Sequence, residues 1–209
     1  MSIQDAYNQW SDAYDHDENR TRDLDQQVTR AVLEGQTFSS ILELGCGTGK
    51  NTLFLAQMGK HVRALDFSAG MLAQARAKVS ASHVEFTQTD LTQRWPVSNE
   101  AVELVVCNLV LEHIENLEFI FAEVARVLKL EGQFLLNELH PFRQYAGRKA
   151  RFQRGTETVK VEAYVHHISD FLGAARLAHL SLGWLHEHWH TADSHKPPRL
   201  VSFLFEKDT

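Results

Sequence analysis

The sequence lacks the long apolar run that a membrane-spanning helix requires. No stretch of the 209 residues approaches the ~20 consecutive apolar residues of such a helix. Residues 1–10 are polar and have no signal-peptide apolar region. We therefore expect a chain that does not cross a membrane, is not secreted, and works in the cytoplasm.

Cysteine is also scarce, and positive charge is in deficit. The two cysteines, Cys46 and Cys107, lie in different apolar contexts. Two cysteines could form one disulfide, but two reduced thiols in a cytoplasmic protein are the simpler interpretation. The formal net charge of −6 argues against a broad nucleic-acid-binding surface, so we expect no nucleic-acid partner. The length and the apolar content of 44% suit one α/β domain over residues 1–209.

Two common glycine-rich nucleotide-binding patterns are missing as well. The dinucleotide fingerprint G-x-G-x-x-G fails because Lys50 holds the third glycine position when counting starts at Gly45, and the frame from Gly47 fails likewise. The phosphate loop requires Ser or Thr after Gly-Lys, where this chain has Asn51. The first absence argues against a nicotinamide-dependent oxidoreductase, which is one alternative function.

What the chain does contain is a strand, a glycine loop and a helix within residues 40–56. The apolar run 41–44 predicts a buried strand, glycines follow at positions 45, 47 and 49, and residues 52–56 have helical character. This arrangement points backbone N–H groups at a ligand. Glycine lets the backbone approach that ligand without an intervening Cβ.

The same alternation of strand and helix continues after the loop. We predict further strands at residues 62–65, 84–88, 101–107 and 133–139, with helices at 68–79 and within 109–129 between them. Repeated βα units imply a parallel sheet with right-handed crossovers. Residues 1–36 precede it as two helices and 140–168 form an insertion with a strand at 158–165. A helix at 169–180 then leads to a terminal hairpin at 184–190 and 200–205.

Polar residues stand where several predicted strands end. An open parallel sheet binds ligands outside the carboxyl ends of its strands. Asp66 ends the second strand, where a carboxylate could accept hydrogen bonds from both hydroxyls of a ribose. Asp90 follows the third strand and could accept from an adenine amino group, and Asn108 ends the fourth. Asp66 alone would more often be a turn residue. Together with the glycine loop after the first strand, however, four strand ends in this order indicate one binding edge.

These motifs resemble those of the class I S-adenosylmethionine-dependent methyltransferases, of the type 11 small-molecule kind, over roughly residues 36–140. The resemblance implies a doubly wound, mainly parallel, seven-stranded Rossmann-like sheet. Its strand order would be 3-2-1-4-5-7-6, with strand seven antiparallel and an N-terminal helical lid. It also implies S-adenosyl-L-methionine as the cofactor and a small-molecule methyl acceptor.

The resemblance also implies which residues bind each partner. The cofactor residues would be Tyr14, Glu43, Gly45, Cys46, Gly47, Asp66, Phe67, Met71, Asp90, Leu91, Asn108 and Leu109. The acceptor residues would be Tyr7, Trp10, Arg143 and His167. Tyr7, Trp10 and Tyr14 fall on one face of a predicted helix and resemble the aromatic lid of this family; plain core packing is the alternative.

Two histidines are candidates for the catalytic side. His113 follows the fourth strand and His140 follows the fifth, so both are expected near the acceptor. Each could orient the acceptor or take its proton near neutral pH, and a wall residue is the alternative role. His186, His188 and His190 alternate along one strand face, but a polar face explains them as well, and we expect no metal.

The insertion carries the one concentrated basic stretch of this acidic chain. Its cationic residues are Arg143, Arg148, Lys149, Arg151 and Arg154. A solvated loop would explain them, whereas folding over the rim would favour an anionic acceptor. Methyl transfer is an in-line displacement in which the protein mainly positions and desolvates, and it requires no metal. A protein that binds the cofactor without catalysis is the second alternative function.

Overall fold

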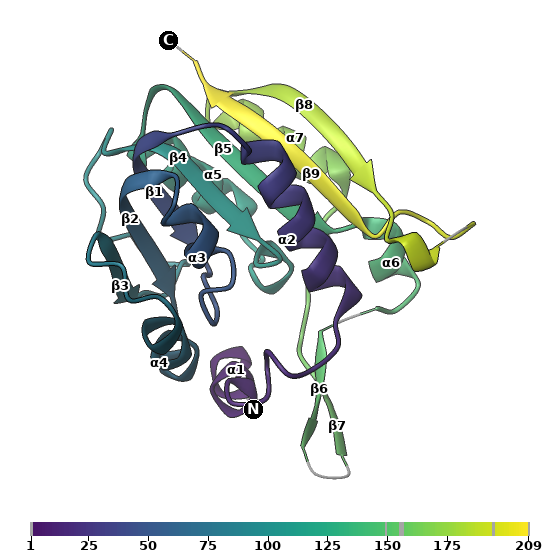
Figure 1. Ribbon diagram of the computed structural model, residues 1–209. Helices are drawn as coiled ribbons and strands as arrows, with labels where there is room; N and C mark the ends of the chain where they lie inside the picture. Colours follow the sequence, from purple (N-terminus) through teal and green to yellow (C-terminus); the bar gives the residue numbers. More distant parts are fainter. Residues whose placement is uncertain (1, 149, 155–156, 194, 209) are drawn as a thin grey trace.

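The computed structural model describes residues 2–148, 150–154, 157–193 and 195–208, and its centre is one seven-stranded sheet (Figure 1). The spatial order is β3-β2-β1-β4-β5-β9-β8. The strands are β1 (Phe38–Leu44), β2 (Gly59–Asp66), β3 (Val84–Gln88), β4 (Val102–Asn108), β5 (Leu128–Leu139), β8 (Leu180–His188) and β9 (Leu200–Lys207). Strands β1 to β5 pair in parallel, and β9 pairs antiparallel with both β5 and β8.

This topology confirms the predicted fold. Numbered within the large sheet alone, the strands follow the order 3-2-1-4-5-7-6. Strand seven, which is β9, runs antiparallel to β5. The labels differ only because a separate hairpin of β6 (Arg151–Arg154) and β7 (Glu157–Lys160) intervenes. The predicted strand over 158–165 is wrong in its second half, because β7 ends at Lys160.

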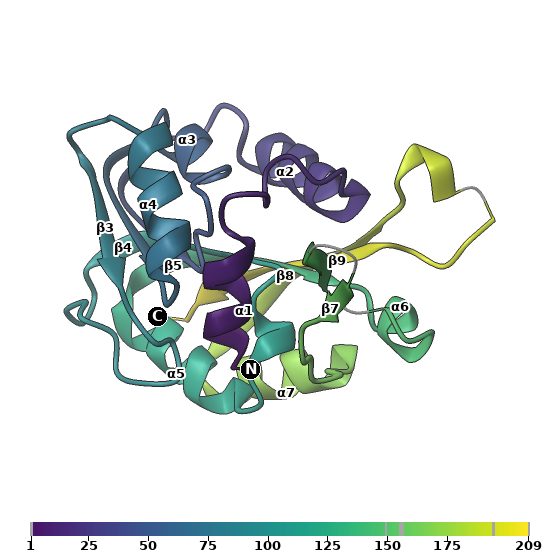
Figure 2. The ribbon, with the colours of Figure 1, turned by 90° about the horizontal axis from the view of Figure 1, so that it is seen from below.

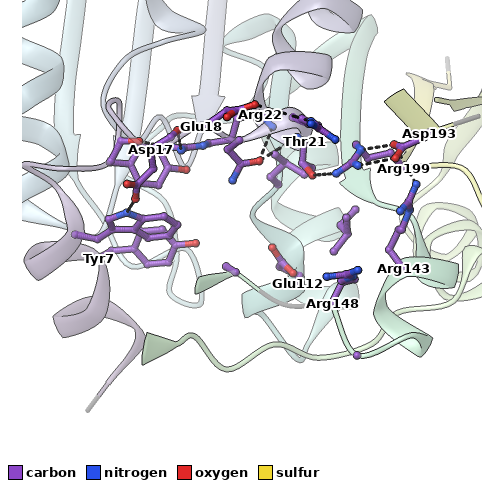
Figure 3. A pocket seen from close by; sticks show the side chains of 18 of the residues that line it. Tyr7, Asp17, Glu18, Thr21, Arg22, Glu112, Arg143, Arg148, Asp193 and Arg199 are labelled. Carbon is purple, nitrogen blue, oxygen red and sulfur yellow. Dashed lines mark hydrogen bonds and ion pairs between the residues drawn. The ribbon is translucent and has the colours of Figure 1, made fainter. Parts of the chain in front are cut away.

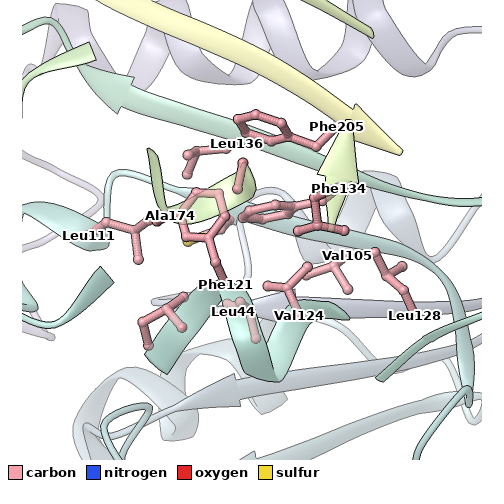
Figure 4. Close-up of a cluster of buried hydrophobic side chains, with 14 of the residues drawn as sticks. Leu44, Val105, Leu111, Phe121, Val124, Leu128, Phe134, Leu136, Ala174 and Phe205 are labelled. Carbon is pink, nitrogen blue, oxygen red and sulfur yellow. The ribbon is translucent and has the colours of Figure 1, made fainter. Parts of the chain in front are cut away.

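Helices cover both faces of the sheet because its central strands are apolar on both sides. Residues Leu104 to Cys107 of β4 are fully buried. Helices α2 (Arg20–Leu33) and α3 (Thr52–Leu55) pack on one face, beside α4 (Ala69–Lys78), and α5 (Leu117–Val127) and α7 (Ile168–Leu177) pack on the other (Figure 2). The larger core lies under α5 and α7, where Phe121, Phe134 and Phe205 meet (Figure 4).

The N-terminal segment crosses the carboxyl ends of the parallel strands. Helix α1 (Ile3–Trp10) begins in a capping box of Ser2 and Asp5 and lies against α4 (Figure 1). It ends at Trp10, so Tyr14 lies beyond the helix. The prediction that Tyr14 shares a helix face with Tyr7 and Trp10 is therefore wrong. The three aromatic rings still lie together, because the chain turns back after α1. The centroid of the Tyr14 ring lies 4.7 Å from that of the Trp10 ring.

Two predicted helices are shorter than expected. The segment predicted as one helix within 109–129 contains a 3₁₀ turn at Leu111–His113 and then α5. Helix α7 ends at Leu177 because His179 takes a positive φ of 55° and Leu180 already belongs to β8. The insertion opens with α6 (Pro141–Tyr145), and a second 3₁₀ turn follows β8 at Thr191–Asp193. Among the described residues, no helix combines the length and the apolar character needed to cross a membrane.

Candidate active site

The glycine loop leaves β1 with three positive φ angles. Gly45, Gly47 and Gly49 have φ values of 66°, 53° and 78°. A Cβ on Gly45 would lie 2.2 Å from the Val110 side chain, so that position has no room for any other residue. A Cβ on Gly47 would meet nothing within 4 Å. The middle of the loop therefore faces open space that a ligand can occupy.

Asp66 lies against this loop, as the strand order predicted. Its Oδ2 accepts a hydrogen bond of 2.8 Å from the Gly47 N–H, and its Oδ1 accepts one of 2.8 Å from the Ser68 N–H. Burial raises the pKa of Asp66 to about 6, against the lowering effect of these backbone donors. Cys46 joins the same region through a 3.0 Å bond from its N–H to the Leu65 carbonyl. The loop and the carboxylate thus form one backbone-bound unit.

Several residues predicted to bind the cofactor are held by contacts within the protein. The Glu43 carboxylate is buried and accepts from the Thr52 hydroxyl, and burial raises its pKa to about 8. Met71 and Leu91 are packed into the hydrophobic interior. Asp90 is exposed and accepts from the Thr92 N–H at 2.9 Å within its own turn. In each case local packing or capping, which spacing does not encode, sets the direction of the side chain.

Asn108 points toward α2 because a buried aspartate holds it there. Asp25 accepts from the side-chain amides of Asn108 at 2.6 Å, Asn137 at 2.9 Å and Asn51 at 3.0 Å. Burial raises the pKa of Asp25 to about 6. Asp25 was not among the predicted site residues, although an acidic residue inside an apolar helix stripe was a signal. Leu109, the next residue, has a φ of 58°.

A cavity of about 760 Å³ lies at the carboxyl edge of the sheet (Figure 3). Its walls come from α1, the connection to α2, the first turn of α2, the turn after β4, the end of β5, the region of α6, and the connection between β8 and β9. These segments contribute, among others, Tyr7, Tyr14, Arg22, Leu109, Arg143 and Arg199. The structure therefore brings two residues predicted for the cofactor, Tyr14 and Leu109, into one cavity with three predicted for the acceptor, Tyr7, Trp10 and Arg143.

Helix α1 is held over this edge by side-chain contacts. Asn8 Oδ1 accepts from the Ser68 hydroxyl at 2.7 Å and from the Gly70 N–H at 3.0 Å. The Tyr7 hydroxyl lies 2.8 Å from Nε2 of His113, and the Phe67 ring stands 6.0 Å from the Tyr7 ring. These contacts hold α1, the predicted lid, at the carboxyl edge of the sheet.

His113 connects the lid to the insertion and does not line the cavity. Its Nδ1 donates to the Glu162 carbonyl at 2.8 Å, which leaves Nε2 to accept from the Tyr7 hydroxyl. Burial lowers the pKa of His113. A neutral imidazole with both nitrogens engaged is suited to holding the lid in place.

His140 is not brought to the cavity, contrary to the prediction for a catalytic histidine. Its ring is 1% exposed; Nδ1 accepts from the Phe142 N–H at 3.2 Å, and Nε2 lies 2.8 Å from a Glu187 carboxylate oxygen. His140 is the N-cap of α6, because the following Pro141 starts that helix. His167 is exposed and bonds the Tyr145 hydroxyl, so it also lies away from the cavity.

Arg22 lines the cavity, although it was not among the predicted site residues. Its guanidinium lies 4.0 Å from the centre of the Tyr14 ring and donates to the carbonyls of Tyr14 and Asp17. Its Nε is buried and has no hydrogen-bond partner. A bound carboxylate would satisfy this donor. Asn19 caps α2 by accepting from the N–H groups of Thr21 and Arg22, so the position of Arg22 is fixed.

The remaining predictions concern metal ligands and the basic insertion. Within the described ranges, no group of three His, Cys, Asp or Glu side chains could hold a metal ion. His186 of β8 stacks on Trp184 at 4.8 Å. Arg148 lines the cavity. Lys149 lies outside the residues that the structure describes, as do the side chains of Arg151 and Arg154.

Comparisons with known proteins agree with this geometry. The family model for the methyltransferase domain matches residues 42–136. An uncharacterized methyltransferase of Emericella nidulans is 30% identical over 213 residues, which cover 83% of this chain and 74% of that protein. A malonyl-[acyl-carrier protein] O-methyltransferase of Enterobacter lignolyticus is 32% identical over 117 residues, which cover 56% of this chain and 45% of that protein. The crystal structure of an S-adenosylmethionine-dependent methyltransferase of Mesorhizobium loti superposes with a TM-score of 0.74 at 20% identity, covering 87% of this chain and 96% of that one.

Proposed function

Because the chain belongs to the S-adenosylmethionine-dependent class I methyltransferases, and its methyl donor is S-adenosylmethionine, we propose that it methylates a small-molecule acceptor. The observation that carries this proposal is the cavity of about 760 Å³ at the carboxyl edge of the sheet, the edge at which β1 and β2 also end in the glycine loop and Asp66. A cavity of this size suits a small molecule rather than a macromolecular surface. Lid helix α1 closes over the same edge, which suits a reaction that must exclude water.

The residues around the loop fit the cofactor at both of its ends. The open space at Gly47 would admit its main chain, and Asp66 would accept from ribose hydroxyls. The unpaired Nε of Arg22 would donate to the methionine carboxylate. Tyr14 would hold Arg22 in this position through its ring.

When bound, the cofactor supplies a methyl group on a positively charged sulfur. A nucleophilic atom of the acceptor would take this methyl group as the carbon–sulfur bond breaks, and the cofactor would be left as a neutral thioether. The task of the protein is to align the acceptor and remove water, which can supply most of the rate enhancement. Tyr7 and Trp10 would cover the acceptor from the lid side.

The test is methyl transfer from radiolabelled S-adenosylmethionine to a protein-free metabolite extract. We expect label in a small-molecule product. Transfer of label only to protein or nucleic acid would contradict a small-molecule acceptor. Cofactor binding without transfer to any acceptor would favour the alternative of a binding protein without catalysis.

We also propose that the protein acts in the cytoplasm and as a single domain over residues 1–209. Cys46 and Cys107 are both free and buried, which suits a reducing compartment. The lid, the sheet and the insertion all contribute to one cavity, which supports a single functional unit.

A further inference from the structure

The cavity carries an excess of positive charge although the whole chain is acidic. The cationic side chains that line it are Arg20, Arg22, Arg143, Arg148, Lys196 and Arg199. The acidic ones are Asp17, Glu18, Glu112 and Asp193. The chain as a whole has a formal net charge of −6. A locally positive cavity in an acidic protein attracts anions.

Two arginines on the side away from the glycine loop share one buried carboxylate (Figure 3). Asp193 accepts from Arg199 Nε at 2.6 Å and Nη2 at 2.9 Å, and it forms an ion pair of 3.0 Å with Arg143 Nη2. The hydrogen bonds from Arg199 help to hold the pKa of Asp193 at about 2, so its carboxylate stays ionised. One negative charge cannot neutralise two guanidinium groups, so one positive charge remains at this wall.

The Arg143 guanidinium is held in a fixed orientation. Its Nε donates to the Pro198 carbonyl at 3.3 Å and its Nη2 to the Pro197 carbonyl at 2.8 Å. The side chain is 12% exposed, and no described hydrogen bond uses its Nη1. Arg148 is brought to the same wall because Gly147 takes a φ of 74° and the Arg148 N–H bonds the Arg143 carbonyl at 3.0 Å. A preorganised cation of this kind loses little entropy on binding an anion.

The other lining residues indicate the chemistry of the rest of an anionic ligand. Leu109 and Leu139 give it an apolar wall. None of the described lining residues is a histidine, and Asp17 already accepts from the Trp10 indole at 2.7 Å. The cavity thus offers a fixed cation and an apolar surface, which suit an ionised acid with an apolar body.

We propose that the methyl acceptor is a small carboxylic acid whose carboxylate pairs with Arg143, with Arg148 as a second cation. The apolar part of the acid lies against Leu109 and Leu139. A carboxylate can accept from the Arg143 Nη1, which no described hydrogen bond uses, and its single charge matches the one unneutralised positive charge of the Arg143–Asp193–Arg199 cluster. This inference rests on the proposed function, since it names the class of acceptor for the same site.

The experiment uses the labelled cofactor and a protein-free metabolite extract, separated by anion exchange into anionic and non-anionic fractions. One portion of the anionic fraction is amidated with a carbodiimide to mask carboxylates, and another is treated with phosphatase. We expect product from the anionic fraction, loss of product after amidation, and retention of product after phosphatase.

The acceptor purified from this fraction is then used to test the role of Arg143. Arg143→Gln is expected to raise the KM for the acceptor about 10- to 100-fold, as loss of a charge-assisted pair implies, with little change in affinity for S-adenosylhomocysteine. Arg143→Lys keeps the charge and is expected to show a smaller rise. Arg176→Gln, an exposed arginine on α7, is the matched control and should leave KM unchanged.

Three results would overturn the inference while leaving the proposed function intact: product from the non-anionic fraction, product that survives amidation, or loss of product after phosphatase. An unchanged KM in folded Arg143→Gln protein would overturn it as well. If Arg143→Gln does not fold, Arg148→Gln replaces it, because Arg148 is exposed; its KM is expected to rise about threefold to tenfold, and an unchanged value overturns the inference. Absence of product from the whole extract would instead contradict the proposed function.

Discussion

Two regions at the carboxyl edge of the sheet are built in different ways. On the side proposed for the cofactor, Asp66 bonds backbone N–H groups of Gly47 and Ser68, which lie close to the ends of two adjacent strands. On the side proposed for the acceptor, Arg143 pairs with Asp193, and Arg199 reaches the Thr21 hydroxyl at 3.0 Å, 178 residues away in sequence. One side depends on backbone geometry, and the other depends on side chains from distant segments.

This difference indicates which side can change without damage to the sheet. The glycine loop cannot accept a side chain at Gly45, because Val110 occupies the space. The arginine wall is carried by α6 and the connection between β8 and β9, which lie outside the parallel strands. A new acceptor would therefore require changes on the second side alone.

The largest expected effect comes from breaking the cofactor side at Asp66. Asp66→Ala removes the acceptor of two backbone N–H groups and of the proposed ribose hydroxyls. We expect binding of S-adenosylhomocysteine to weaken by about 1–3 kcal/mol, measured by isothermal titration calorimetry. Glu34→Ala, at an exposed acid after α2, is the control. An unchanged dissociation constant in folded Asp66→Ala protein would rule out this role.

The second prediction concerns Glu138, near the end of β5. Its Oε1 accepts from the N–H groups of Val110 at 3.0 Å and Leu111 at 2.8 Å, and burial raises its pKa from 4.5 to about 8. A carboxyl whose pKa is higher in the folded state holds its proton more tightly there. Its contribution to stability is therefore fully present below about pH 4.5 and is lost as the pH rises through about 8.

Glu138→Gln should remove this pH dependence and keep an oxygen for the same donors. Urea unfolding between about pH 5 and about pH 7 should show a free energy of unfolding that falls less steeply with pH in the variant, by up to about 1.4 kcal/mol per pH unit. Glu118→Gln, at an exposed position of α5, is the control. Parallel pH profiles for wild type and Glu138→Gln would show that folding does not raise the pKa of Glu138.

A smaller effect is expected from loosening the lid. Tyr7→Phe removes the hydrogen bond to His113 and keeps the aromatic contacts with Trp10 and Phe67. One hydrogen bond of about 0.5–1.5 kcal/mol should make amide exchange across residues 2–10 about twofold to tenfold faster. Tyr164→Phe, at an exposed tyrosine, is the control.

The ligand provides the second half of this test. S-adenosylhomocysteine should slow exchange across residues 2–10 in the wild type, because the lid closes over the edge that binds it. Identical exchange with and without ligand would mean that α1 is a fixed part of the core.

The smallest effect is expected at His140. The structure makes it the cap of α6, so His140→Ala should cost about 0.5–2 kcal/mol of stability and should change turnover by no more than roughly threefold. His140→Asn, which keeps a capping side chain, should restore the melting temperature. A loss of turnover of ~10²-fold in folded His140→Ala protein would instead indicate that His140 takes part in catalysis.

The sequence by itself determined the order of elements and the cofactor edge. Alternating strands and helices fix a parallel sheet, and in such a sheet the ends of β1 and β2 must lie side by side, so the glycine loop and Asp66 meet. Only the tertiary structure decided where the side chains of Asn108 and His140 point. Asn108 turns to Asp25 on α2, and His140 turns to Glu187 on β8.

The physical reason is the range of the interactions. Backbone direction and strand pairing follow from local patterns of apolar residues and glycine, which a sequence displays. The direction of a buried polar side chain follows from the partner that satisfies it, since an unpaired buried group costs about 1–3 kcal/mol. For Asn108 that partner is 83 residues away, and for Arg143 the ion-pair partner is Asp193. Such pairs exist only once the sheet has brought the segments together.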